Sequence, residues 1–198
     1  MLSRDNAILT QLSQKLYFAV SDLANIFRIK LSSAKVLASR YTKNGIFFRL
    51  KKDFYVLNQS WQNYTTDDFF KLSNMIQVPS YISFMTALNY YEITTQVQRN
   101  FFESAAQKRT IKYDIKGTQF FYYKLKKEFY FDFIKQGDIF IATKEKALVD
   151  SLYLYSFGKY KLDWASIDFA KLDKSRIRKI IEKYPVKTKK IIKIICKI

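Results

Sequence analysis

Nine side chains in one short stretch of the sequence have the types and spacing of a surface that binds DNA. Their small hydroxyl groups can bond phosphates or base edges, and their lysine and arginine groups carry the charge that attracts a polyanion. Seven fall on the polar side of a predicted helix, and two fall at the tip of a predicted hairpin. The nine are Ser32, Ser33, Lys35, Val36, Ser39, Arg40, Lys43, Lys51 and Lys52.

Two short helices must hold the first seven of these side chains. Ser21 is a suitable N-cap for a helix over residues 22–27, with the acidic Asp22 at its positive end. Residues 28–30 interrupt the pattern, and Ser32 can cap a second helix that runs to about Asn44. On that helix, four apolar residues recur at the spacing of one buried face: Ala34, Leu37, Ala38 and Tyr41.

A hairpin follows the second helix. Gly45 stands where a left-handed residue commonly ends a helix, and strands are expected over residues 46–50 and 54–57. Residues 3–16 predict an earlier helix, and residues 17–20 predict a small strand that pairs with the hairpin. Helix, turn, helix and hairpin is the order of a winged helix-turn-helix, which we expect to occupy residues 1–60.

A second domain is expected over residues 74–198, after a linker or docking helix over residues 61–73. After Pro79, either Ser80 or Ser83 can cap a helix that ends near Tyr91. An antiparallel sheet should follow, because the apolar residues then alternate with a period of two. We expect its strands over residues 111–115, 120–125, 129–134 and 139–142.

Helices should complete the chain. Thr143 is a suitable N-cap for the next one, and Asp173 or Ser175 for another that Pro185 ends. The last helix is basic and amphipathic, and its apolar side is expected to hold Ile191, Ile194, Ile195 and Ile198. The predicted fold class is therefore α+β, with an N-terminal winged helix and a mixed α/β C-terminal domain that contains the antiparallel sheet.

The charge of the chain favours a polyanionic partner. Its 198 residues carry a formal net charge of +18, of which residues 1–60 contribute +7, residues 61–150 contribute +2 and residues 151–198 contribute +9. Such an excess bears on partners and not on fold. A hydrophobic content of 48% and an aromatic content of 18% exclude a disordered chain.

Residues typical of enzymes are scarce. The chain has no histidine and one cysteine, so no His-based nucleophile system and no zinc site of several thiolates can form. No glycine-rich phosphate loop is present, and we expect no catalytic residue, cofactor or metal. The pairs Asp67-Asp68 and Asp132 with Asp138 are interpreted as a helix cap and a turn. Residues 144–146 are interpreted as a solvated helix start, and Tyr122-Tyr123 and residues 129–131 as core more than as stacking platforms.

The cysteine content and the apolar runs of the chain bear on its compartment and on membrane association. The single Cys196 fits a reducing cytoplasm, and residues 1–14 lack the apolar segment of a signal peptide. No apolar run approaches the length of a membrane span. A cytoplasmic protein without a membrane partner is expected.

Two segments resemble a known family. They are PSYISFMTALNYYEI, residues 79–93, and IFIATKEKALVDSLYL, residues 139–154. Together with the predicted winged helix they resemble the AbiEi antitoxins of bacterial type IV toxin–antitoxin systems, and the likeness covers most of the chain.

The resemblance implies a protein with two functions. The winged helix would bind inverted repeats in its own promoter as a repressor, as a monomer or a dimer assembled on DNA. The C-terminal domain would counteract a nucleotidyltransferase toxin without necessarily forming a stable complex with it. Matching the winged helix residue by residue places DNA contacts on eight of the nine positions named above: Ser33, Lys35, Val36, Ser39, Arg40, Lys43, Lys51 and Lys52.

Two other function classes remain open. A non-enzymatic protein could bind RNA or another polyanion through its basic terminal segments. A nuclease or transferase could use a carboxylate site without a familiar motif. Sequence-preferring binding to duplex DNA favours the repressor, equal binding to single-stranded RNA favours the second class, and metal-dependent turnover favours the third.

Overall fold

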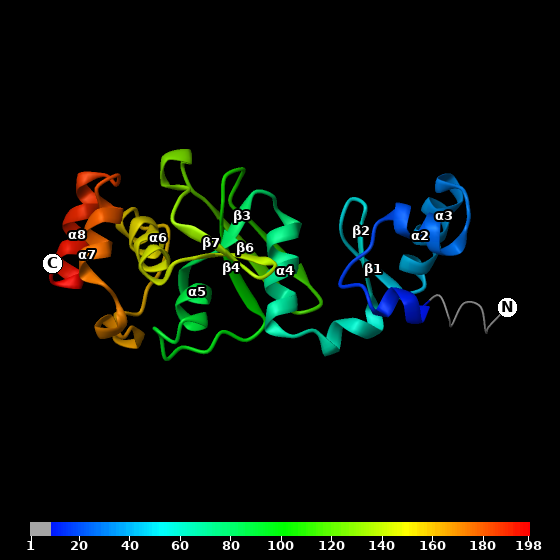
Figure 1. The fold of residues 1–198 in the computed structure, drawn as a ribbon, viewed down its shortest axis with the longest axis horizontal. Helices are drawn as coiled ribbons and strands as arrows, with labels where there is room; N and C mark the ends of the chain where they lie inside the picture. Colours follow the sequence, from blue (N-terminus) through cyan, green and yellow to red (C-terminus); the bar gives the residue numbers. More distant parts are fainter. Residues whose placement is uncertain (1–8) are drawn as a thin grey trace. The chain divides into compact units, whose positions relative to one another are not determined.

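The computed structural model describes residues 9–198 (Figure 1). The start of the helix expected over residues 3–16 lies outside these residues, while residues 9–13 are helical. The fold is a mixed α+β fold in two compact units. We call Met1–Leu72 the N-terminal unit and Ser73–Ile198 the C-terminal unit, and the division falls within one helix, α4.

The N-terminal unit contains the two expected helices, with earlier starts than predicted. Helix α2 spans Val20–Phe27 and its N-cap is Ala19, so the expectation for Ser21 is wrong. The reason is Asp22, whose carboxylate accepts a hydrogen bond from the Ala19 backbone N–H at 2.8 Å and thereby satisfies an amide one turn earlier.

Helix α3 spans Leu31–Lys43, and its N-cap is Lys30, not Ser32. The chain leaves α2 through Arg28, which has a left-handed conformation with φ of 53°. This turn places residue 30 in the extended conformation from which α3 starts directly. The end of the helix is as predicted, because Gly45 adopts a φ of +72° just after it.

The hairpin is formed by β1, Phe47–Lys51, and β2, Phe54–Leu57, which pair antiparallel around a two-residue loop. Residues 17–20 do not form the expected strand. Phe18 alone bridges to Tyr55, with reciprocal backbone hydrogen bonds of 2.9 Å, because helix α2 already begins two residues later. The strand pairing between residues 17–20 and the hairpin is therefore reduced to a single bridge.

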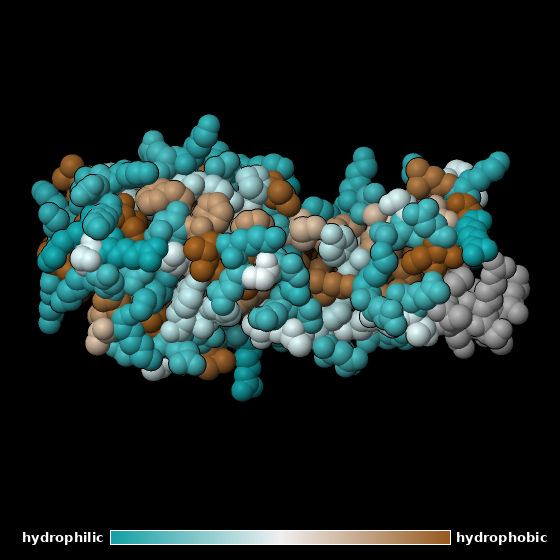
Figure 2. All heavy atoms as spheres, viewed as in Figure 1, coloured by the Kyte–Doolittle hydropathy of each residue, from teal (hydrophilic) through white to brown (hydrophobic). Residues whose placement is uncertain are grey.

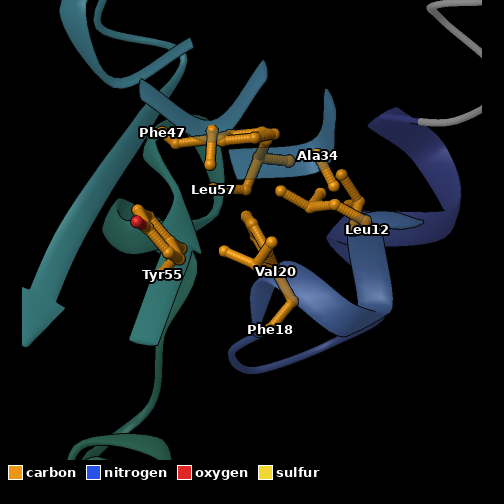
Figure 3. Close-up of a cluster of buried hydrophobic side chains, with 9 residues drawn as sticks. Leu12, Phe18, Val20, Ala34, Phe47, Tyr55 and Leu57 are labelled. Atoms are coloured by element: carbon orange, nitrogen blue, oxygen red, sulfur yellow. The ribbon is translucent and has the colours of Figure 1, made fainter. Parts of the chain in front are cut away.

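The core of the N-terminal unit lies between the helices and the hairpin (Figure 3). Ala34 and Ala38 are fully buried, and their small side chains let α3 approach the strands closely. Phe18 meets Phe47 edge to face, with ring centroids 4.8 Å apart. The buried members of the cluster are Leu12, Phe18, Val20, Leu23, Ala34, Ala38, Phe47, Tyr55 and Leu57.

The segment expected as a linker or docking helix is ordered into two helical elements. A 3₁₀ turn, η1, spans Asn58–Asn63, and helix α4 spans Thr66–Ile76. Asp68 and Thr65 cap α4 reciprocally, because the carboxylate accepts from the Thr65 N–H at 3.0 Å and the threonine hydroxyl accepts from the Asp68 N–H at 3.2 Å. The interpretation of this acidic pair as a helix cap therefore holds for Asp68.

The C-terminal unit is built on one six-stranded sheet with the order β5-β6-β4-β3-β8-β7. The sheet is mixed and not antiparallel as expected, since β4 pairs with β6 and β3 pairs with β8 in parallel. After β4 the chain passes to the edge of the sheet, and the hairpin of β5 and β6 then places β6 between its partners. The strands are β3 Ser80–Ile82, β4 Phe101–Ala106, β5 Ile111–Ile115, β6 Thr118–Lys124, β7 Phe133–Gln136 and β8 Ile139–Ala142.

One local prediction in this unit is right in part, and another is wrong. Ser80 lies in β3, and the next helix, α5, spans Phe84–Tyr90. Ser83 stands at its N-cap but caps no helix amide, because its hydroxyl donates to Asp150 instead. The strand expected over residues 129–134 is replaced by a 3₁₀ turn, η2, over Lys127–Phe129 and by the later strand β7.

The last helices pack as a further layer beyond the sheet (Figure 1). Helix α6 spans Lys144–Ser156 with Thr143 as its cap, as predicted, and α7 spans Lys174–Ile181 with Asp173 as its cap. Short 3₁₀ turns, η3 Trp164–Ser166 and η4 Phe169–Lys171, connect these two helices.

The apolar face predicted for the last helix, α8 Val186–Cys196, is wrong. Its buried residues are Thr188, Ile192 and Cys196, whereas Ile194 is 76% exposed. The buried residues follow one another at four-residue spacing, which is the spacing of a single helical stripe. Within residues 9–198, no helix has the length and apolar character needed to cross a membrane.

Candidate nucleic-acid interface

Helix α3 presents one polar, cationic face to solvent. The structure exposes all seven side chains predicted to face outward, and it buries Ala34, Leu37 and Ala38 on the opposite face. The helix contains three basic residues and no acidic one. The exposed seven are Ser32, Ser33, Lys35, Val36, Ser39, Arg40 and Lys43.

Two features of this face are informative beyond its charge. Val36 is 70% exposed, which is unusual for a branched apolar side chain on a helix with a well-packed opposite face. No side chain caps the start of α3, so its first amides point outward without a side-chain acceptor. Both features suit a partner that offers methyl groups and anionic oxygens.

The tip of the hairpin is held by an acidic residue in its loop. Asp53 has a φ of 56°, and its carboxylate accepts a hydrogen bond from the Val20 N–H at 2.8 Å. Lys52 is exposed beside it. Lys51, the other lysine predicted at the tip, is half-buried. Its ammonium group lies 5.3 Å from the centroid of the Phe54 ring. The tip is thus tied to the start of α2.

Exposure alone does not distinguish this face from the rest of the surface. Figure 2 shows hydrophilic side chains over most of the face in view, with hydrophobic patches between them. What sets α3 apart is that its cations and hydroxyl groups project, together with the apolar Leu31 and Val36, from a helix whose other side is fixed in a core. This is the condition for reading base edges.

A second polar cluster is completely buried in the C-terminal unit. Lys146 and Asp150 form an ion pair within helix α6, and both side chains have no exposed surface. The Lys146 ammonium group also donates to the hydroxyl groups of Tyr81 at 3.1 Å and Tyr184 at 3.0 Å. Asp150 accepts from Tyr81 and from Ser83, both at 2.9 Å. The interpretation of residues 144–146 as a solvated helix start is therefore wrong.

The electrostatics of this cluster follow from its burial. Loss of water lowers the pKa of Lys146, and the neighbouring Asp150 acts in the opposite direction. Burial and the same aspartate raise the pKa of Tyr81 and of Tyr184 well above the usual value. Because no atom of the ion pair reaches solvent, the cluster holds α6, β3 and the segment before α8 together and is not an open site. In the sequence, only the spacing of four between Lys146 and Asp150 within an apolar segment could have indicated this buried cluster.

Another buried acid lies on β4. Glu103 is 2% exposed, and its carboxylate accepts from the Tyr160 hydroxyl at 2.8 Å, the Met85 N–H at 3.1 Å and the Gln98 amide at 3.3 Å. Burial raises the pKa of Glu103 to about 7, although its hydrogen bonds act to lower it. The Tyr123 hydroxyl also donates to this carboxyl group, at 3.5 Å.

One carboxylate of the pairs considered from the sequence, Asp132, has close polar partners. Asp132 is engaged by Arg176 at 2.8 Å and by the Thr143 hydroxyl at 2.8 Å. Arg176 also lies 3.8 Å from the buried Glu145. Across the described part of the chain, no three acidic, histidine or cysteine side chains come close enough to hold a metal ion. Tyr122 and Phe129 are buried, as expected for core aromatics.

Comparison with known proteins supports the fold alone. No family model matches the sequence, and no curated protein matches it. Among solved structures, the chain is similar to the RV2827C protein from Mycobacterium tuberculosis. The match has a TM-score of 0.60 at 8% sequence identity and covers 98% of this chain and 76% of that protein. It places the two-unit α+β architecture among structures already observed.

Proposed function

We propose that this chain binds double-stranded DNA through a winged helix-turn-helix in its N-terminal unit. Helix α3 would enter the major groove, and the hairpin would lie on the neighbouring backbone as the wing. The observation that carries the proposal is the exposed face of α3, which combines three cations, three serines and no acidic residue on a helix anchored by buried alanines.

Different side chains on α3 suit different parts of the groove. Arg40 can pair with a guanine edge in a bidentate geometry, which a lysine cannot match. The methyl groups of Val36 can contact the methyl group of a thymine, a contact that gives sequence preference without a hydrogen bond. The uncapped start of the helix, with Ser32 and Ser33, suits a phosphate.

The first experiment measures binding of the full chain to duplex DNA from the region upstream of its own gene. Fluorescence anisotropy should give salt-dependent binding that is stronger than binding to a scrambled duplex. Arg40→Ala should weaken binding to the preferred duplex by about 1–3 kcal/mol, because it removes a base contact. Lys43→Ala should weaken binding to both duplexes to a similar extent, as expected of a phosphate contact.

A matched control separates this face from general charge. Arg178 is an exposed arginine of α7 in the C-terminal unit, and Arg178→Ala removes the same charge at a distant position in the chain. It should leave the preference between the two duplexes unchanged. If Arg40→Ala and Lys43→Ala leave duplex binding unaltered, α3 is not the recognition helix. Equal binding of single-stranded RNA would favour the alternative of an RNA- or polyanion-binding protein.

The resemblance to AbiEi antitoxins extends the proposal to a repressor that also counteracts a nucleotidyltransferase toxin in the cytoplasm. The buried, fully hydrogen-bonded Lys146–Asp150 pair lies in residues 139–154, one of the segments that carry the resemblance. It supports a structural role for that segment.

Co-expression with a nucleotidyltransferase encoded beside the gene tests this extension. The chain with both Arg40→Ala and Lys43→Ala should still protect cells while it no longer represses its promoter. This result is expected because the substituted side chains lie on α3 of the N-terminal unit. Loss of protection together with loss of repression would show that the two functions are not separate.

A further inference from the structure

A hollow of about 750 Å³ opens in the C-terminal unit. Strand β6 and the residues that follow it form one wall, and the end of helix α6 with the residues after it forms the other. The volume lies within the range of about 300–1,000 Å³ that is typical of small-molecule sites.

Aromatic rings from both walls line the hollow. On β6, Phe121 and Tyr123 stack with ring centroids 4.4 Å apart and an angle of 30° between their planes. On the opposite side, Tyr153 meets Phe157 edge to face at 5.4 Å. Phe157 is 45% exposed, although a phenylalanine gains free energy by burial. A planar ring entering the hollow would therefore find aromatic surface on two sides.

The position of the Tyr123 ring is fixed from behind. Its ring packs on Phe84 at 4.8 Å and meets Tyr160 edge to face at 5.4 Å. Its hydroxyl lies 3.5 Å from the carboxylate of the buried Glu103, which also bonds Tyr160. The Tyr123 ring is thus held in place without a ligand, so binding carries no entropic cost for ordering this side chain.

The charge of the hollow is entirely positive. Lys124, Lys126 and Lys159 line it, and no acidic residue does. Lys126 has an exposed partner, Glu128, at 3.8 Å. Within residues 9–198, no ion pair is formed by Lys124 or Lys159. A fourth lysine, Lys187, lies 5.3 Å from the Phe157 ring.

We propose that this hollow binds a nucleoside phosphate, with the base against the aromatic walls and the phosphate at the lysines. An apolar ligand alone would leave the lysines without a partner, and an inorganic anion would leave the rings without one. Stacking accepts any base, because each presents a π-face, and positive charge at the rim favours phosphate. The nucleotide can be free or can be the end of a single strand.

Equilibrium binding to the full chain tests the proposal and separates these two sources. The probes are the four nucleoside 5′-monophosphates, adenosine, inorganic phosphate and a 5′-phosphorylated single-stranded oligonucleotide. The chain carries Arg40→Ala and Lys43→Ala throughout, so that α3 does not contribute to the signal from the strand. A monophosphate should bind more tightly than both adenosine and inorganic phosphate. Binding of the strand about tenfold tighter than of any monophosphate would identify a strand end, and otherwise the ligand is the free nucleotide.

Substitutions in the lining place the binding in this hollow. Phe157→Ala should weaken binding of the monophosphate by at least about fivefold, because one stacking partner is lost. Lys124→Gln with Lys159→Gln should weaken it by about tenfold and should abolish the advantage of the monophosphate over adenosine. Phe157 is partly exposed and both lysines are exposed, so these variants should remain folded.

The matched control is Lys135→Gln, which removes an exposed lysine from β7, the edge strand farthest from β5 in the order of the sheet, and not from the lining. It should change the affinity by less than about twofold. The proposal is overturned if Lys135→Gln weakens binding as much as the lining variants do. It is equally overturned if inorganic phosphate binds as tightly as the monophosphates, or if no probe binds.

Discussion

Two sets of lysines in this molecule have opposite roles. On α3 and the hairpin, Lys35, Lys43 and Lys52 are exposed, and their ammonium groups stay hydrated until a partner displaces the water. In the C-terminal unit, Lys146 is fully buried and every donor direction meets an oxygen of Asp150, Tyr81 or Tyr184. The first group is available for binding, and the second is committed to holding the fold.

The difference shows that local sequence does not determine what a lysine does. Residues 144–146 read as a common helix start, and only the packing of β3 and Tyr184 over α6 removes Lys146 from water. An exposed ion pair contributes little, whereas a buried charge that loses its partner costs several kcal/mol. Substitutions in the two regions should therefore differ in kind, with loss of folding in one and loss of binding in the other.

The largest effect is expected at the buried pair. Lys146→Met should lower the free energy of unfolding by about 3–5 kcal/mol, because Asp150 would remain buried without its cation. Urea denaturation followed by circular dichroism measures this change. Lys35→Met on α3 is the matched control and should alter the free energy of unfolding by less than about 0.5 kcal/mol.

A double substitution sharpens this comparison. Adding Asp150→Leu to Lys146→Met removes both charges, so the double variant should be more stable than Lys146→Met alone. Recovery should be incomplete, because Tyr81, Ser83 and Tyr184 would lose their acceptor. If the double variant is less stable than the single one, the isolated charge is not the cause of the destabilisation.

The second prediction concerns Glu103 and pH. Its pKa is raised from 4.5 to about 7 in the folded protein, so the folded state binds the proton more tightly than the unfolded state does. The stabilisation is fully present below pH 4.5 and is lost as the pH rises to about 7. The loss is on the order of 3 kcal/mol at most. The chain has no histidine, so few other groups titrate in this window.

Glu103→Gln provides the test. The glutamine oxygen can accept from Tyr160 and Met85, as the oxygen of Glu103 does, and glutamine carries no titratable group. Between pH 5 and pH 8 the free energy of unfolding should fall in the unsubstituted protein and should change much less in the variant. Parallel curves for the two proteins would assign the pH dependence to other groups.

The smallest effect is expected at the hairpin tip. In the proposed DNA complex, Lys52→Gln should lower the slope of log affinity against log salt concentration by about one unit and leave the preferred DNA sequence unchanged, because one phosphate contact would be lost. Binding isotherms at several salt concentrations measure the slope. Lys127→Gln removes an exposed lysine from the C-terminal unit and should not change it. An altered sequence preference in Lys52→Gln would place this side chain at a base.

Features set by neighbouring residues were predictable from the sequence. The end of α3 at Gly45, the strand β2 and the cap of α6 by Thr143 each depend on a few adjacent side chains. The outward positions on α3 follow from helical periodicity. The starts of α2 and α3 were not predictable in this way, because Asp22 and Arg28 compete with the serines that the sequence offers as caps.

Features set by distant residues were not predictable. Alternating residues indicate a strand but not its neighbours, so the parallel pairs of the sheet remained hidden. The contact of Lys51 with Phe54 depends on an irregular register in the hairpin. The hollow is formed by residues from β6, from the end of α6 and by Pro185, so no single segment of the sequence could predict it.

The pairing of β3 has a consequence for how the chain folds. Ile82 pairs with Ile141. Tyr184, which accepts a hydrogen bond from Lys146, lies 38 residues after that lysine in the sequence. Contacts between residues distant in the sequence form slowly, since the entropy of closing a long loop is lost before the contacts contribute any stabilisation. During synthesis the N-terminal unit can therefore fold from local contacts well before the ribosome has released the residues that close the second unit. A nascent chain that already holds a finished α3 would still have an incomplete C-terminal core, exposed for that interval to chaperones and proteases.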